Sequence, residues 1–73
     1  MEHIFIINIR KTDNGIKVIA ECNKGIAFVP FEANLESQQN VRVAVEALKS
    51  KFNIIGDFEI RHFSDLRYVA IQQ

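Results

Sequence analysis

The chain has few residues that cross-link or sharply bend a backbone: its 73 residues include one cysteine, one proline, three glycines and no tryptophan. A single cysteine, Cys22, excludes an internal disulfide. Small proteins without disulfides are typical of reducing compartments, so we expect a cytoplasmic location. The N-terminal apolar run, Ile4–Ile7, is too short for a signal peptide or a membrane span. We therefore expect neither export nor membrane insertion.

The chain also lacks an excess of charge of either sign, because nine Lys and Arg residues balance nine Asp and Glu residues. No overall field attracts it to nucleic acid, to an anionic membrane or to an acidic partner. Its length allows one domain, residues 1–73, of modest stability. The composition, 48% hydrophobic and 25% charged, is that of an ordinary globular domain.

Asn14-Gly15 is the strongest local structural signal in the chain. Asn-Gly between two apolar runs predicts a tight hairpin turn, because both central residues of that turn need positive φ angles. We expect strands at residues 4–10 and 16–23, both rich in Ile and Val with an alternating pattern. In this register Ile9 lies opposite Ala20.

Lys24-Gly25 predicts a second turn and a third strand. Pro30 cannot donate to a sheet, so it marks this strand as an edge or as ending there. In this register Ala20 faces Val29. The three strands then share one apolar face, made of Phe5, Ile7, Ile9, Val18, Ala20, Cys22, Ala27, Val29 and Phe31. Agreement of three segments in one register is stronger support for a shared apolar face than the β propensity of any single segment.

An amphipathic helix is predicted from Leu35 to Lys51, with Asn34 as its N-cap. Glu36 in the first turn and Lys49 in the last suit the helix dipole. The apolar residues recur at intervals of three and four, as a helix with one buried face requires. They are Val41, Ala44, Val45, Leu48 and Phe52.

The C-terminal residues return to a strand pattern, from Asp57 to Phe63 and from Leu66 to Gln72, with a turn at Ser64-Asp65. In the predicted register the core face holds Phe58 with Ile71 and Ile60 with Val69, and Glu59, Arg61 and Tyr68 point the other way. The order is β-β-β-α-β-β. We therefore predict an α+β fold, an antiparallel sheet with one amphipathic helix packed on one face.

One helix covers only one face of such a sheet. The reverse face of the first three strands is more apolar than a solvated face requires, since it carries Ile4, Ile6, Ile19, Ile26 and Phe28. Three interpretations remain open. The C-terminal hairpin folds over this face to make a sandwich or partial barrel, or the face is an interface, most commonly that of a symmetric homodimer. In the third, these are scattered exposed apolar residues without a function.

A second candidate surface is the C-terminal hairpin, which concentrates Arg61, His62, Arg67 and Tyr68. Cationic and aromatic groups on a β-ribbon can contact phosphates and stack on bases. An Arg packed on a Tyr is equally ordinary sheet stabilisation. We regard nucleic-acid binding as the alternative function.

No residue pattern indicates catalysis or metal binding. Cys22 with His3 or His62 lacks a third orienting group, and Cys22 is predicted on the apolar face, where cysteine acts as a small hydrophobe. Asp57 and Glu59 share a strand face but have no deep cleft to desolvate them. Two histidines and one cysteine do not make a zinc site. We expect no cofactor and no metal.

The sequence therefore favours a small non-enzymatic binding or regulatory module that acts through protein contacts, as a homodimer or on a larger protein. The predicted interface is the apolar reverse face. A small nucleic-acid-binding protein is the alternative, and an enzyme assembled only at an oligomer interface is a third class.

Overall fold

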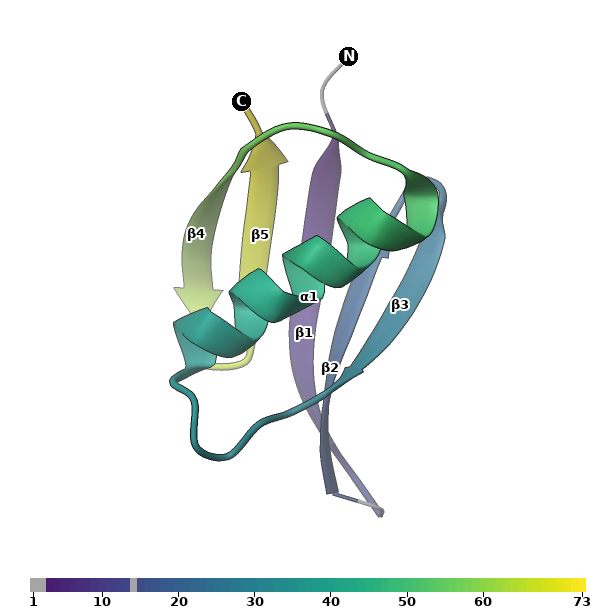
Figure 1. Cartoon of the computed structure of the whole chain (residues 1–73). Coiled ribbons are helices and arrows are strands. Elements are labelled where there is room, and N and C mark those ends of the chain that lie inside the picture. Colours follow the sequence, from purple (N-terminus) through teal and green to yellow (C-terminus); the bar gives the residue numbers. More distant parts are fainter. Residues whose placement is uncertain (1–2, 14) are drawn as a thin grey trace.

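A computed structural model describes residues 3–13 and 15–73, and Figure 1 shows its arrangement. Five strands form one antiparallel sheet in the order β3-β2-β1-β5-β4, and one helix crosses it. This confirms the predicted α+β fold. The elements are β1 (Ile4–Thr12), β2 (Gly15–Cys22), β3 (Gly25–Pro30), α1 (Ser37–Phe52), β4 (Phe58–Ser64) and β5 (Arg67–Gln72).

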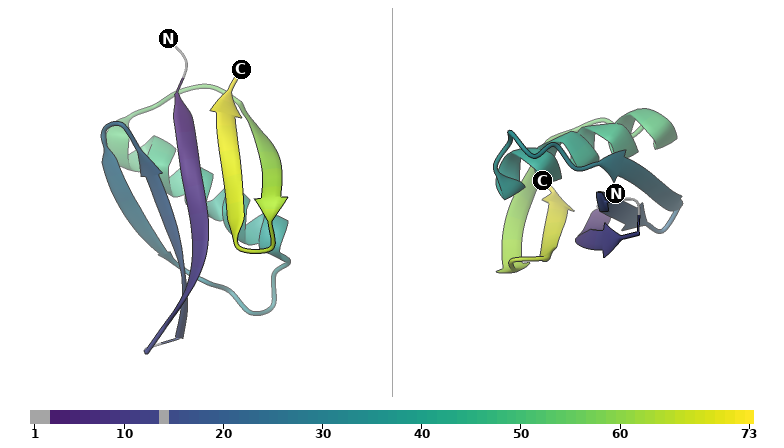
Figure 2. Two further views of the ribbon diagram at one scale, coloured as in Figure 1. Left: turned by 180° about the vertical axis from the view of Figure 1, so that it is seen from behind. Right: turned by 90° about the horizontal axis from the view of Figure 1, so that it is seen from below.

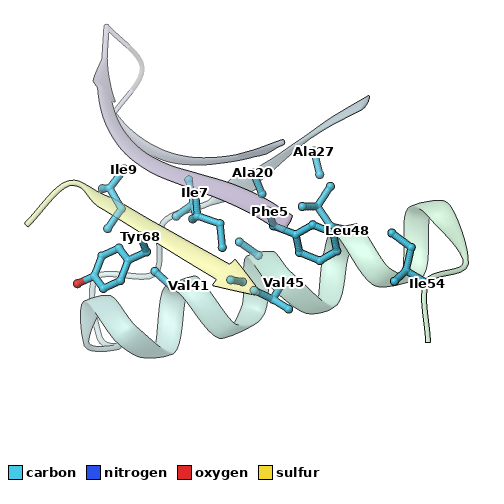
Figure 3. Close-up of a cluster of buried hydrophobic side chains, with 13 residues drawn as sticks. Phe5, Ile7, Ile9, Ala20, Ala27, Val41, Val45, Leu48, Ile54 and Tyr68 are labelled. Atoms are coloured by element: carbon cyan, nitrogen blue, oxygen red, sulfur yellow. The ribbon is translucent and has the colours of Figure 1, made fainter. Parts of the chain in front are cut away.

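The hydrophobic core lies between α1 and one face of the sheet (Figure 3). The predicted apolar stripe of the helix is confirmed, because Val41, Ala44, Val45 and Leu48 are buried and Phe52 packs against them. The predicted face of the first three strands is confirmed as well. Its buried residues are Phe5, Ile7, Ile9, Val18, Ala20 and Ala27, with Cys22, Val29 and Phe31 partly buried at the margin.

The registers of the first two hairpins differ from the predicted ones by two residues. Ile7, rather than Ile9, pairs with Ala20, and Thr12 pairs with Gly15. Gly15 therefore belongs to β2, and Asn14 lies outside the described residues. Because side chains alternate with a period of two, a shift of two residues leaves each side chain on its predicted face.

In the second hairpin Cys22 pairs with Gly25, so the turn is Asn23-Lys24 instead of Lys24-Gly25. Gly25 has a different role. A Cβ at this position would lie 2.6 Å from the Cζ atom of Phe52, and the φ angle is +152°. The glycine allows the last turn of α1 to pack directly onto the backbone of β3.

The C-terminal hairpin differs from its prediction by one residue, which changes its faces. The pairing shifts between His62 and Ser64, where Phe63 is the extra residue of a bulge. Ile60 then pairs with Ala70 rather than Val69. The prediction that Tyr68 points away from the core is wrong, since its side chain is 3% exposed on the α1 side.

The helix begins at Ser37, two residues later than predicted, and its N-cap is Glu36 instead of Asn34. A buried polar residue near this start, Asn40, is 1% exposed. Its Oδ1 accepts a hydrogen bond from the backbone N–H of Glu32 (2.9 Å), and its Nδ2 donates to the carbonyl oxygens of Glu32 and Glu36 (both 3.2 Å). This side chain thus holds the connection from β3 in a fixed path ahead of α1.

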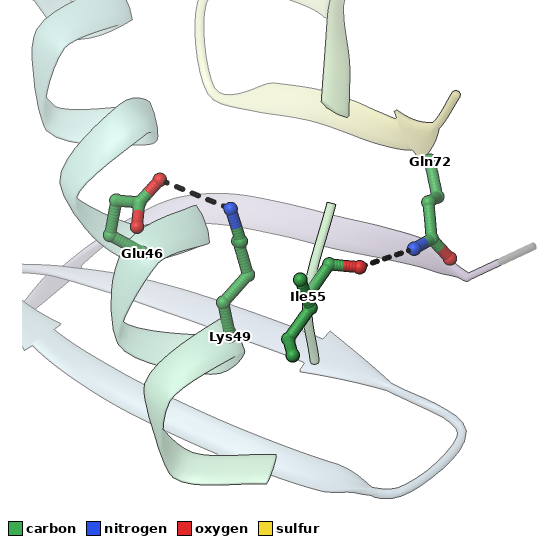
Figure 4. A network of polar contacts seen from close by, with 4 residues as sticks. All are labelled: Glu46, Lys49, Ile55 and Gln72. Atoms are coloured by element: carbon green, nitrogen blue, oxygen red, sulfur yellow. Dashed lines mark hydrogen bonds and ion pairs between the residues drawn. The ribbon is translucent and has the colours of Figure 1, made fainter. Parts of the chain in front are cut away.

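The side chain of Gln72 is hydrogen-bonded to the connection from α1 to β4. Its Nε2 donates to the carbonyl oxygen of Ile55 (2.9 Å), and its Oε1 accepts from the backbone N–H of His3 (3.0 Å). Figure 4 shows the Ile55 contact beside an ion pair on α1, between Lys49 and Glu46 (3.6 Å). One side chain therefore links the start of β1 to the segment that crosses the end of the sheet.

The reverse face of the sheet has no covering element among the described residues. The C-terminal hairpin joins the sheet beside β1, through pairing of β5 with β1, so it does not fold over this face. Figure 2 shows the sheet from behind with the helix on its far side. Of the interpretations left open by the sequence, the sandwich or partial barrel is wrong. We call this uncovered surface the open face.

Candidate functional site

The open face carries all five residues of the predicted interface. Ile4 and Ile6 lie on β1, Ile19 on β2, and Ile26 and Phe28 on β3. Phe28 pairs with Ile19, which makes these two side chains direct cross-strand neighbours. Phe28 is 66% exposed and Ile4 is 54% exposed. The structure therefore gathers these residues on one surface that faces solvent.

Two further apolar residues, Val69 and Ile71, extend this surface onto β5. Val69 pairs with Ile6, and Ile71 pairs with Ile4. The sequence analysis placed both in the core because it set the C-terminal register one residue off. The bulge at Phe63 causes this difference of one residue in register, and no residue type in that hairpin predicts a bulge. The apolar surface thus spans four neighbouring strands, from β3 to β5.

Charged residues lie around the apolar surface and, at Glu21, within it. Arg10 and Lys17 are paired at one end of the open face, and Arg61 and Glu59 lie on β4 at its side. Glu21 lies between Ile6 and Ile26, in register with both. The open face therefore combines apolar residues with charges of both signs.

A shallow hollow of about 580 Å³ lies on the open face, with Ile19, Ile26 and Phe28 on one side and Asn8, Leu66 and Arg67 on the other. The guanidinium Nε of Arg67 donates to Oδ1 of Asn8 at 3.1 Å. This contact fixes the arginine along the sheet surface. The hollow therefore has an apolar side and a side that carries an arginine.

The four residues of the predicted nucleic-acid surface are divided between the two faces. Arg61 and Arg67 are exposed on the open face. Tyr68 lies in the core on the other face, and its ring stacks on that of His62 with 4.7 Å between centroids. The Nε2 atom of His62 lies 4.0 Å from Oδ1 of Asp65. The structure therefore does not bring Tyr68 together with the two arginines.

The side chains considered for catalysis or metal binding do not come together in the structure. Cys22 packs at the margin of the core, as predicted, and its Sγ accepts a hydrogen bond from the backbone N–H of Lys24 (3.4 Å). Glu59 pairs with Arg61 on the same strand (3.5 Å). Within residues 3–13 and 15–73, no three His, Cys, Asp or Glu side chains are grouped as metal ligands would be.

No protein-family model, curated protein or solved structure matches this chain. Over the described part of the chain, no helix combines the length and apolar character needed to cross a bilayer. The geometry of the open face and of the sheet edges is therefore the basis for any statement about function.

Proposed function

We propose that this protein is a small non-enzymatic module that acts through protein contacts, and that the open face is its interface with a second copy. The observation that carries the proposal is the apolar surface on four adjacent strands, with no element of the described chain over it. Contiguous exposed apolar surfaces of this kind mark interaction sites in soluble proteins.

A second copy is the partner that suits the charges of this face. The chain as a whole has no net charge, so two copies do not repel one another. The open face itself carries both acidic and basic residues, such as Glu21 and Arg67. In a self-complementary interface, one patch meets its own copy about a two-fold axis, so a patch with both signs can pair its acidic residues with the basic residues of the copy. The single cysteine favours a reducing compartment, and we place the protein in the cytoplasm.

The test is sedimentation velocity on the wild type and on Phe28→Lys over a wide concentration range. Phe28 is exposed, so lysine at this position leaves the fold intact and places a charge in the apolar centre. We expect the substitution to halve the mass of the assembly. Val43→Lys on the outer side of α1 is the matched control and should leave the mass unchanged. Equal masses for all three folded proteins would overturn the proposal.

Nucleic-acid binding is the second candidate, because three of the four arginines of the chain, Arg10, Arg61 and Arg67, lie on the open face. If this candidate is right, a single-stranded oligonucleotide binds at low salt, and affinity falls steeply as salt rises. Arg61→Ala and Arg67→Ala should then weaken binding, whereas Arg42→Ala on α1 should not. Absence of binding at low salt would remove the candidate.

A further inference from the structure

The two edges of the sheet differ in how they are protected from pairing with another strand. At the β3 edge, Pro30 has no N–H to donate, and Nζ of Lys51 donates to the carbonyl oxygen of Ile26. A proline and a lysine are the usual means by which proteins block an edge strand. Over residues 58–62 of the described chain, no comparable contact occupies the outward backbone groups of β4, and the bulge of this strand lies beyond them at Phe63.

The backbone groups that β4 offers to a partner follow from its pairing with β5. The N–H of Gln73 donates to the carbonyl oxygen of Asp57 at 2.9 Å. Hydrogen-bonded positions alternate along an antiparallel pair, so Glu59 and Arg61 also direct their N–H and C=O groups to β5. Those of Phe58, Ile60 and His62 therefore point outward along the edge.

We propose that β4 pairs antiparallel with β4 of a second copy, about a two-fold axis at Ile60, and joins the two sheets into one. Ile60 then faces the partner's Ile60, and Phe58 faces the partner's His62. Each of these pairs exchanges two backbone hydrogen bonds. These bonds use all the outward N–H and C=O groups of Phe58, Ile60 and His62. This interface is formed by the backbone of the β4 edge, next to the open face, and it does not require the apolar residues of that face.

Charge selects this register over its neighbours. With the axis at Ile60, Glu59 lies opposite the partner's Arg61, and Arg61 lies opposite the partner's Glu59. Moving the axis by one residue, which keeps the outward groups aligned, sets Glu59 against itself or Arg61 against itself. Directly opposed unlike charges stabilise a strand pair and like charges destabilise it. The axis at Glu59 also sets Arg61 opposite the partner's Asp57, so the register about Ile60 is the one that opposes unlike charges without opposing like charges.

The edge also borders a place where the core is incompletely covered. Phe58 and Ile60 are only partly buried, and they line a hollow of about 450 Å³ beside Val45 and Arg42 of α1. In Figure 1 the helix crosses the sheet obliquely and ends over β3, far from the start of β4. In the proposed pairing the partner's His62 lies next to Phe58 and covers this margin.

The first test removes the outward N–H of Ile60. Ile60→Pro leaves the bonds to β5 in place, because the Ile60 N–H does not take part in them, and proline is tolerated on an edge strand. We expect it to halve the mass measured by sedimentation velocity. Ile60→Ala keeps the N–H and is the matched control, with the mass of the wild type. An unchanged mass for folded Ile60→Pro would overturn the proposal.

The second test is specific to the register. Glu59→Arg alone and Arg61→Glu alone oppose like charges and should each halve the mass, whereas an equimolar mixture of the two should restore it, with each edge joining one variant to the other. Glu32→Arg, on the connection after β3, controls for the change in net charge. Assembly of each single variant with itself, or failure of the mixture to assemble, would overturn the register.

The two interfaces can be told apart. If the open face is not an interface, Phe28→Lys has no effect while Ile60→Pro still halves the mass. If the edge is not an interface, Ile60→Pro has no effect on the mass while Phe28→Lys still halves it. A wild-type chain that stays at 8.4 kDa at every concentration would overturn both.

Discussion

The two faces of the sheet are built from the same residue types but have different environments. On the α1 side, Phe5 and Ile7 are fully buried, whereas their neighbours Ile4 and Ile6 in β1 are exposed on the open face. The difference arises because a chain of this length supplies one helix, which covers one face. Apolar residues on the covered face stabilise the monomer. Those on the open face add little to it, which is why we assign them to contacts between molecules.

The largest effect should come from Tyr68, whose ring fills the covered side of β5. Tyr68→Ala removes a buried aromatic side chain, so we expect a loss of about 3–5 kcal/mol in the free energy of unfolding. Urea denaturation followed by circular dichroism measures it. Arg61→Ala, on the open face of the adjacent strand, is the comparison and should cost less than about 0.5 kcal/mol. Equal losses would contradict the register of the C-terminal hairpin.

Asn40 should have the next largest effect, since it is the buried polar residue that joins the start of α1 to the connection after β3. Asn40→Ala leaves the N–H of Glu32 and the carbonyl of Glu36 without this partner. We expect a loss of about 1–3 kcal/mol in the free energy of unfolding. Gln38→Ala on the exposed surface of α1 is the control. A loss no greater than that of the control would contradict the account.

Gly25 tests the packing of α1 on the covered face. In Gly25→Ala the new methyl group meets the ring of Phe52, and the φ angle of +152° is unfavourable for alanine. We expect a loss of about 1–3 kcal/mol. Phe52→Leu combined with Gly25→Ala should recover part of that loss relative to the sum of the single substitutions. Purely additive losses would show that the ring and the glycine do not interact.

The smallest effect on the monomer should come from Phe28, the most exposed apolar residue of the open face. Phe28→Ala should change the free energy of unfolding of the monomer by less than about 0.5 kcal/mol. The measurement belongs at a concentration where the chain does not associate. A loss above about 2 kcal/mol would mean that Phe28 is buried within the monomer and that the open face is covered.

The faces of β1 to β3 could be predicted from sequence even though both turns were placed wrongly. The errors were two residues each, and the alternation of side chains has the same period, so Ala20 and Val18 remained on the core face. The error in the C-terminal hairpin was one residue, which moved Tyr68 and Val69 to opposite faces. A bulge of one residue is set by packing in the folded sheet and has no local signal.

The start of the helix and the free edge were not predictable for another reason. Asn34 satisfies the local rules for an N-cap, but Asn40 binds the backbone of Glu32 and Glu36, a tertiary contact that the sequence does not reveal. The position of β4 at an edge depends on the pairing of β5 with β1. The five apolar residues of the open face were identified because their alternation alone defines a face.

The most direct test of the open face as an interface is the concentration dependence of isoleucine methyl signals in NMR, because isoleucines lie on both faces. The account predicts that the methyl shifts of Ile4, Ile6, Ile19 and Ile26 change as the protein associates. The buried Ile7 and the exposed Ile55, in the connection after α1, should not change. Association that leaves the four open-face methyl signals unchanged would contradict the account.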